Sequence, residues 1–120
     1  NIGGAKNYIQ ASKIAFSIAN SPLVKTAIAG QDANWGRVIM AIGKADTKII
    51  QNKIELKFGK YLVAKNGQMS KKINIKLLDI YMKKKIIEIN VNLGLGKFKR
   101  RVYSSDLTHE YIRINADYRS

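Results

Sequence analysis

The chain has 120 residues, enough for one domain, and its 46% hydrophobic and 25% charged residues are typical of a globular protein. It contains no cysteine, which excludes disulfides, thiolate catalysis and cysteine metal ligands. No apolar run approaches the ~18 residues of a membrane span, and no signal peptide is readable. Because the sequence opens at Asn1 without methionine, we expect a soluble chain whose natural start was removed by processing or truncation.

The net charge of +14 allows two interpretations. A strongly basic chain can bind nucleic acid or another anionic surface. Lysine far outnumbers arginine, however, and arginine is the residue that makes bidentate contacts to bases and phosphates. The charges are also spread along the whole sequence, which favours a lysine-rich surface without a nucleic-acid partner. The basic clusters at 83–85 and 97–101 keep a nucleic-acid-binding α+β module open as the alternative.

Three helices are predicted in the first third of the chain. Apolar residues recur at helical spacing within 6–20, and this face consists of Ala11, Ile14, Ala15 and Ile18. Ser21 and Pro22 are typical of an N-cap and a first helical residue, so a second helix is predicted over 22–29, ended by Gly30.

Asp32 or Asn34 can cap the third helix, which we expect to end at Gly43. Its apolar positions are Val38, Ile39, Ala41 and Ile42.

Alternating apolar and polar residues predict strands after residue 44. Residues 54–58 alternate in this way, and 61–64 form a second short strand before the turn pair Asn66 and Gly67. The segment 73–82 is ambiguous, and its apolar spacing favours a helix.

The clearest strand pattern covers residues 87–93, where Ile, Val and Leu alternate with Glu and Asn. Gly94 and Gly96 predict a tight turn into a strand over 98–104, so the two strands form an antiparallel hairpin. Ser105 or Asp106 can cap a last helix. This order predicts an α+β fold with helices packed on a mixed or antiparallel sheet.

Residues with recognisable chemistry are few. His109 is the only histidine, and a catalytic or metal-binding role would need partners that converge on it in space, so a solvent-exposed or capping histidine is favoured. Gly94 and Gly96 precede a strand rather than a helix, which does not fit a phosphate-binding loop. The glycine pair Gly3 and Gly4 is too short a motif to indicate any function. Trp35 and Arg37 favour structural roles, as a core anchor and a partner for a carboxylate or helix end.

Several longer runs point to a known family. They are SPLVKTAIAG at 21–30, DANWGR at 32–37, AIG at 41–43, LVAKNG at 62–67, VNLG at 91–94 and SDLTHEYIRINADYRS at 105–120. In this order they resemble the bifunctional glutamate N-acetyltransferase/ornithine acetyltransferase family of arginine biosynthesis, the ArgJ family. The resemblance identifies residues 1–120 as the C-terminal portion of its β subunit, a single and incomplete domain of the DmpA/ArgJ-like fold.

The resemblance implies a specific chemistry. Members cleave themselves before a threonine, which becomes the N-terminal nucleophile of the β subunit and carries an acetyl group from N2-acetylornithine to glutamate; some also use acetyl-CoA. No threonine of this chain matches that nucleophile, so we expect no catalytic residue, cofactor or metal site here and no turnover by the chain alone. Expected partners are the α subunit and the rest of the β subunit, in a cytoplasmic heterotetramer without membrane or nucleic acid.

Two positions carry over from the family motif as substrate-binding residues, Asn115 and Ser120. An amide can donate to and accept from the polar groups of an amino acid, and a terminal hydroxyl can anchor its ammonium group. The alternatives are that Asn115 caps a helix and that Ser120 is a frayed end. We also expect the first three helices and the hairpin to bury their apolar faces against strands outside this chain.

Overall fold

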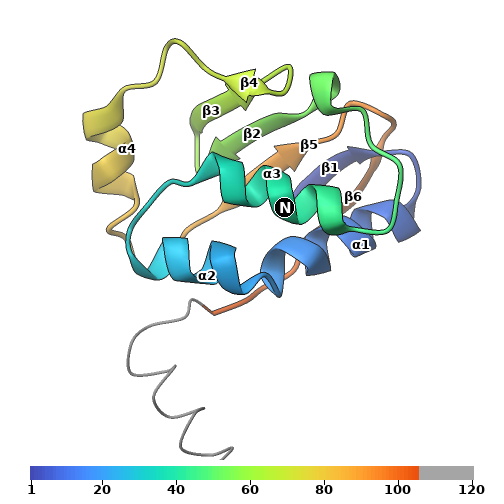
Figure 1. The fold of residues 1–120 in the computed structure, drawn as a ribbon, viewed down its shortest axis with the longest axis horizontal. Helices are drawn as coiled ribbons and strands as arrows, with labels where there is room; N and C mark the ends of the chain where they lie inside the picture. The colour runs from blue at the N-terminus through green and yellow to red at the C-terminus, as the bar shows by residue number, and fades with distance from the viewer. Residues whose placement is uncertain (106–120) are drawn as a thin grey trace, which may run out of the picture.

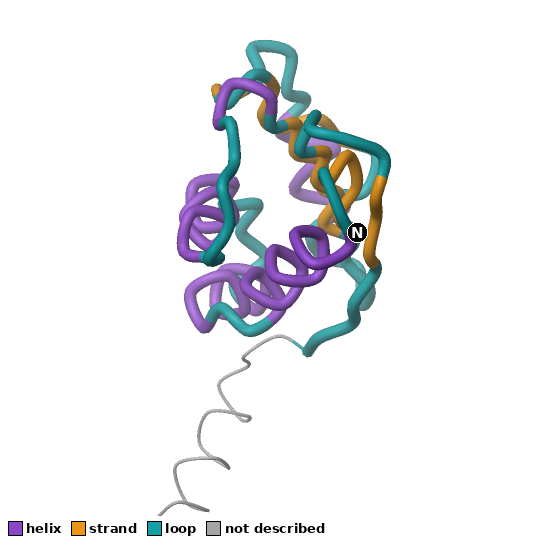
Figure 2. The backbone as a smooth tube through the Cα atoms, turned by 90° about the vertical axis from the view of Figure 1, so that its right-hand side faces the viewer, coloured by secondary structure: helices purple, strands orange, loops and turns teal. Residues whose placement is uncertain are grey.

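The computed structural model describes residues 1–105, in which three helices cover one face of a six-stranded sheet (Figures 1 and 2). The elements in chain order are β1 (Ile2–Ala5), α1 (Tyr8–Ala19), α2 (Pro22–Ala29), α3 (Trp35–Lys44), the 3₁₀ turn η1 (Gln51–Lys53), β2 (Glu55–Phe58), β3 (Tyr61–Lys65), β4 (Gln68–Met69), α4 (Ile75–Tyr81), β5 (Ile89–Asn92) and β6 (Phe98–Arg100). The predicted α+β class, with helices on a mixed sheet, is confirmed. None of these helices has the length and hydropathy needed to cross a membrane.

The helix predictions within residues 1–105 are confirmed, and local capping explains the boundaries of the first three; the predicted last helix after Ser105 lies outside the described residues. The side chains of Asn7, Ser21 and Asn34 accept hydrogen bonds from the third residue beyond each, which begins α1, α2 and α3. Asn34 rather than Asp32 caps α3, and that helix runs one residue past Gly43. α4 occupies the segment whose pattern was ambiguous.

The strand order is β4-β3-β2-β5-β1-β6, with β1 and β5 parallel and all other neighbouring pairs antiparallel. The predicted hairpin of β5 and β6 is therefore wrong, because β1 lies between these two strands. The loop through Gly94 and Gly96 passes over the end of β1, where the Leu95 and Gly96 amides donate to the Gly4 carbonyl at 2.7 and 2.8 Å.

The prediction missed β1 because the strand contains two glycines and only four residues, too few to show alternation. Gly4 is nevertheless a structural requirement of this strand. Its φ of +64° is in the left-handed region, and an added Cβ would clash with the Asn92 side-chain oxygen. The short edge strand β4 was also missed, although its turn at 66–67 was predicted.

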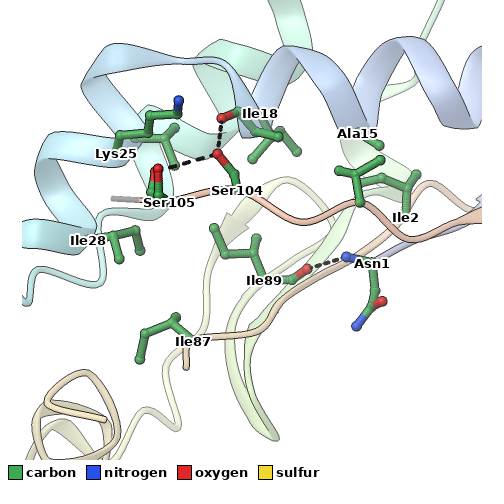
Figure 3. A pocket seen from close by; sticks show the side chains of 13 residues that line it. Asn1, Ile2, Ala15, Ile18, Lys25, Ile28, Ile87, Ile89, Ser104 and Ser105 are labelled. Atoms are coloured by element: carbon green, nitrogen blue, oxygen red, sulfur yellow. Dashed lines mark hydrogen bonds between the residues drawn. The ribbon is translucent and has the colours of Figure 1, made fainter. Parts of the chain in front are cut away.

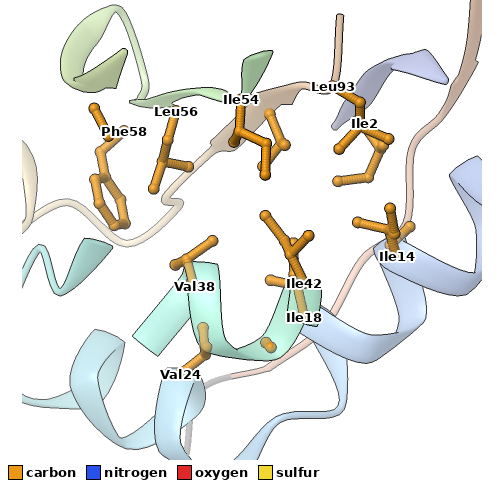
Figure 4. Packing of buried hydrophobic residues seen from close by; sticks show 14 of the residues in the cluster. Ile2, Ile14, Ile18, Val24, Val38, Ile42, Ile54, Leu56, Phe58 and Leu93 are labelled. Carbon is orange, nitrogen blue, oxygen red and sulfur yellow. The ribbon is translucent and has the colours of Figure 1, made fainter. Parts of the chain in front are cut away.

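The core lies between the sheet and the helices (Figure 4). Leu56 and Phe58 of β2 and Ile54 just before it are fully buried and face Val38 and Ile42 of α3. The expectation that the helices bury their apolar faces against strands outside the chain is wrong for these residues. The chain's own sheet covers them, and within residues 1–105 no helix covers the other face of the sheet, which we call the open face.

Candidate functional site

The open face of the sheet contains a hollow of about 620 Å³ over its central strands, which we call the polar hollow. The polar side chains of β2 and β5 in it, such as Lys57 and Asn90, alternate along each strand with residues buried toward the helices, so they point away from the core. The lining residues are Asn1, Ile2, Gly3, Glu55, Lys57, Asn90, Val91, Asn92, Lys99, Arg100 and Arg101.

A row of hydrogen bonds crosses the polar hollow. Arg101 Nε donates to Asn1 Oδ1 at 2.6 Å, and Asn1 Nδ2 donates to Asn90 Oδ1 at 2.7 Å. Asn90 Nδ2 then donates to the Gly59 carbonyl at 2.9 Å, in the turn between β2 and β3. These bonds join side chains far apart in sequence and hold the amide groups in fixed orientations.

The electrostatics of the polar hollow are basic. Lys57 Nζ lies 3.6 Å from Glu55 Oε1, while Lys99 and Arg101 add positive charge. Solvent reaches these groups, so the ion pair contributes little to stability. At Asn1, burial lowers the pKa of the α-amino group below its usual 8.0, and the Arg101 guanidinium lowers this pKa further. The surface suits a polar or anionic group.

Both threonine hydroxyls of the described residues bond to neighbouring groups. The Thr26 hydroxyl donates to the Pro22 carbonyl at 2.7 Å, and the Thr47 hydroxyl accepts from the Gln10 amide at 3.3 Å. Within residues 1–105 no three histidine, cysteine or acidic side chains gather in a way that would hold a metal ion.

A second cavity of about 130 Å³ lies between the sheet and helices α1 and α2, and we call it the slot (Figure 3). Its walls are mainly apolar. Ile87 and Ile89 line one part of it and Ser104 another, the helices cover it, and Val102 also lines it. Ser104 Oγ donates to the Ala19 carbonyl at 2.7 Å, which fixes the segment after β6 against α1.

Comparison with known proteins assigns the chain to a family. The model of the ArgJ family matches residues 1–120. The chain belongs to the ArgJ family.

Individual ArgJ proteins are similar over nearly the whole chain. The "arginine biosynthesis bifunctional protein ArgJ" of Bartonella quintana is 50% identical over 119 residues, which is 99% of this chain and 29% of that protein. The protein of the same name from Caulobacter vibrioides is 44% identical, over 99% of this chain and 30% of its own length. The chain thus spans less than a third of these relatives.

The crystal structure of ArgJ from Bacillus halodurans shares this fold, with a TM-score of 0.91 and 36% sequence identity. The alignment covers 98% of this chain and 55% of that one. The resemblance predicted from the sequence runs is confirmed, as is the expected ArgJ-like fold.

The two substrate-binding residues predicted from the ArgJ motif, Asn115 and Ser120, lie outside the described residues, as does His109. Trp35 is partly buried and packs against the core, as predicted, whereas Arg37 Nη1 donates at 2.9 Å to the Leu23 carbonyl in the first turn of α2 and not to a carboxylate.

Sequence reasoning missed the polar hollow. Alternation in 87–93 predicts that Asn90 faces away from the core, which is correct. Nothing in the sequence indicates that Asn1 and Arg101 lie beside it, because that depends on β1 pairing between β5 and β6.

Proposed function

We propose that residues 1–120 form the C-terminal portion of the β subunit of a glutamate N-acetyltransferase/ornithine acetyltransferase. The complete enzyme would transfer an acetyl group from N2-acetylornithine to glutamate in arginine biosynthesis, releasing ornithine, in the cytoplasm. The observation that carries this proposal is the ArgJ family match over the entire chain, supported by the TM-score of 0.91 to the Bacillus halodurans protein. Acetyl-CoA is a candidate second donor.

In this proposal the chain supplies a scaffold and part of the substrate site, and the nucleophile comes from elsewhere. An N-terminal threonine of the β subunit would form the acetyl-enzyme, which divides the transfer into two steps. Neither Thr26 nor Thr47 fits that role, because both lie inside the chain and their hydroxyls bond to neighbouring elements. The partners would be the α subunit and the rest of the β subunit, assembled as a heterotetramer.

Asn115 and Ser120 are the proposed substrate-binding residues. The amide of Asn115 can donate to the substrate's carboxylate and accept from its ammonium group, and the hydroxyl of Ser120 can accept from the same ammonium group. Loss of one hydrogen bond to a charged group costs roughly 1.5–3 kcal/mol, or about 10- to 100-fold in kcat/KM.

The nucleic-acid-binding alternative gains no support from the relatives, which are named as arginine biosynthesis proteins. The two basic clusters also lie apart in the fold. Residues 83–85 follow α4, whereas residues 97–101 include β6, and these elements are well separated in Figure 1. They do not form the single basic stripe typical of a nucleic-acid interface.

The test is acetyl transfer from N2-acetylornithine to glutamate by the complete encoded polypeptide. Asn115→Ala should lower kcat/KM about 10- to 100-fold in an enzyme that still cleaves itself. Asn52→Ala, at a solvent-exposed position in η1, is the matched control and should leave kcat/KM unchanged. Equal activity of the two variants would remove Asn115 from the substrate site, and no transfer by the cleaved wild type would refute the proposed function.

A further inference from the structure

The slot lies in line with β1, between two segments that continue beyond the ends of β5 and β6. The α-amino nitrogen of Asn1 donates to the Ile89 carbonyl at 2.9 Å, and the Val91 amide donates to the Asn1 carbonyl at 2.9 Å. These are the paired bonds of a parallel ladder, in which one residue bonds to two residues on the neighbouring strand. The ladder of β1 and β5 thus reaches Asn1 with regular geometry.

The next ladder groups along this edge of β5 point into the slot. In a parallel ladder every second residue bonds toward the same neighbour, so the Ile89 N–H and the Ile87 carbonyl follow the two bonds made by Asn1. Both residues line the slot, as do Val102 and Ser104, which follow β6 on the other side of β1. The slot is therefore bounded by strand-like segments on both sides, as the position of a missing strand would be.

The register of β1 determines which side chains of such a strand would point into the slot. Ile2 pairs with Val91 of β5 and with Arg100 of β6, and its side chain is buried toward the helices. The position before Asn1 would point the same way, since side chains alternate along a strand. It would lie between Ile89 and Val102.

Helices α1 and α2 close the slot with apolar side chains, mainly those of Ile18, Val24 and Ile28. An apolar cavity of about 150 Å³ holds a benzene-sized group, so the 130 Å³ here suits one or two aliphatic side chains.

We infer that the slot binds an extended polypeptide segment that continues β1, with apolar residues at the first and third positions before Asn1 and a polar residue between them. Its source is the stretch immediately preceding Asn1 in the longer polypeptide, so this inference rests on the proposed placement within an ArgJ enzyme. The relatives are more than three times as long as the aligned region, and Asn1 itself lines the slot, so a residue bonded to its nitrogen would enter it. The interaction is strand addition, in which main-chain bonds give affinity and alternate side chains give specificity.

Hydrogen–deuterium exchange at the Ile89 amide tests this inference. The comparison uses the 120-residue chain and the complete encoded polypeptide. The Ile89 amide should exchange at least about tenfold more slowly in the complete polypeptide, because the added strand accepts its hydrogen bond. The Val91 amide is the internal control, since it is already bonded to Asn1 and should be protected in both. Equal exchange at Ile89 with Val91 protected in both would overturn the inference.

A matched pair of substitutions in the complete polypeptide sharpens the test. Val102→Lys places a charge in the slot and should restore fast exchange at Ile89, whereas Tyr103→Lys, at the neighbouring position with an 86% exposed side chain, should not. Equal exchange rates at the Ile89 amide in the two variants would contradict the binding of a strand in the slot.

Acetyl transfer measured on the same wild-type sample separates the two proposals. Transfer without Ile89 protection would overturn only the inserted strand, and protection without transfer would overturn only the proposed activity.

Discussion

The two halves of the sheet differ in how completely this chain builds them. On one side, β2 pairs with both β3 and β5, and its apolar side chains are fully buried under α3. On the other side, β1 and β6 have only four and three residues, and the slot lies in line with β1. The first half contains one hairpin of sequence neighbours, β2 and β3, and β2 also pairs with β5. The second half depends on β1, which lies between β5 and β6, and on a segment we place in the longer protein.

Removing a core side chain from the first half should have the largest effect. Phe58→Ala should lower the free energy of unfolding of the 120-residue chain by about 3–5 kcal/mol, because Phe58 is fully buried and leaves a cavity. Val102→Ala, at the half-buried wall of the slot, should cost about 1 kcal/mol or less. Urea denaturation followed by circular dichroism measures the free energy of unfolding of both variants. Equal losses of stability would contradict the difference between the two halves of the sheet.

Substitution of Gly4 tests how strongly the second half depends on β1. Gly4→Ala should destabilise the chain by roughly 2–4 kcal/mol, since the backbone is left-handed and the new Cβ would meet the Asn92 side chain. Gly43→Ala is the matched control, because its Cβ meets nothing within 4 Å in α3, and it should stabilise by about 0.5–1 kcal/mol. A neutral Gly4→Ala would show that β1 is not held in this conformation.

A smaller effect is expected where β6 is attached to α1. The Arg100 guanidinium lies 5.3 Å from the centre of the Tyr8 ring and 5.4 Å from that of Phe16, and it also donates to the Tyr8 hydroxyl. Arg100→Ala should therefore cost about 1 kcal/mol in thermal or urea unfolding. Lys99→Ala, on the opposite face of β6, should change stability by less than about 0.5 kcal/mol. A neutral Arg100→Ala would mean that other contacts hold this edge.

The smallest expected effect is a pH dependence at the slot. Because burial lowers the pKa of the Asn1 α-amino group in the folded 120-residue chain, the unfolded chain takes up this proton first as pH falls below 8.0. Stability from this group should be fully present above pH 8.0 and decline as pH falls through the lowered pKa. Urea midpoints measured across this range should show the decline. An N-terminally acetylated chain, which lacks the titrating amine, should not.

Local sequence signals predicted most of the helical layer and the first half of the sheet. The caps at Ser21 and Asn34 and the apolar alternation of 54–58 act within a few residues, and the structure confirms them. The hairpin prediction failed because it assumed that strands adjacent in sequence pair with each other. The parallel pair of β1 and β5 joins residues about ninety positions apart, and a two-glycine strand gives no periodic signal for it.

The candidate site was predictable to a lesser degree. Its polar character follows from the alternation that places Asn90 and Lys57 on the open face. The contacts that organise the face, from Arg101 through Asn1 to Asn90, depend on the order of the strands. The predicted substrate-binding residues Asn115 and Ser120 came from the family motif alone and stay predictions.

The most direct test of the central claim compares acetyl transfer from N2-acetylornithine to glutamate by the complete encoded polypeptide and by the 120-residue chain. The complete polypeptide should cleave itself and turn over, whereas the 120-residue chain should fold and show no transfer, since it lacks the N-terminal threonine. Transfer by the 120-residue chain alone, or none by a correctly cleaved complete polypeptide, would contradict the claim that this chain is the scaffolding portion of an ArgJ acetyltransferase.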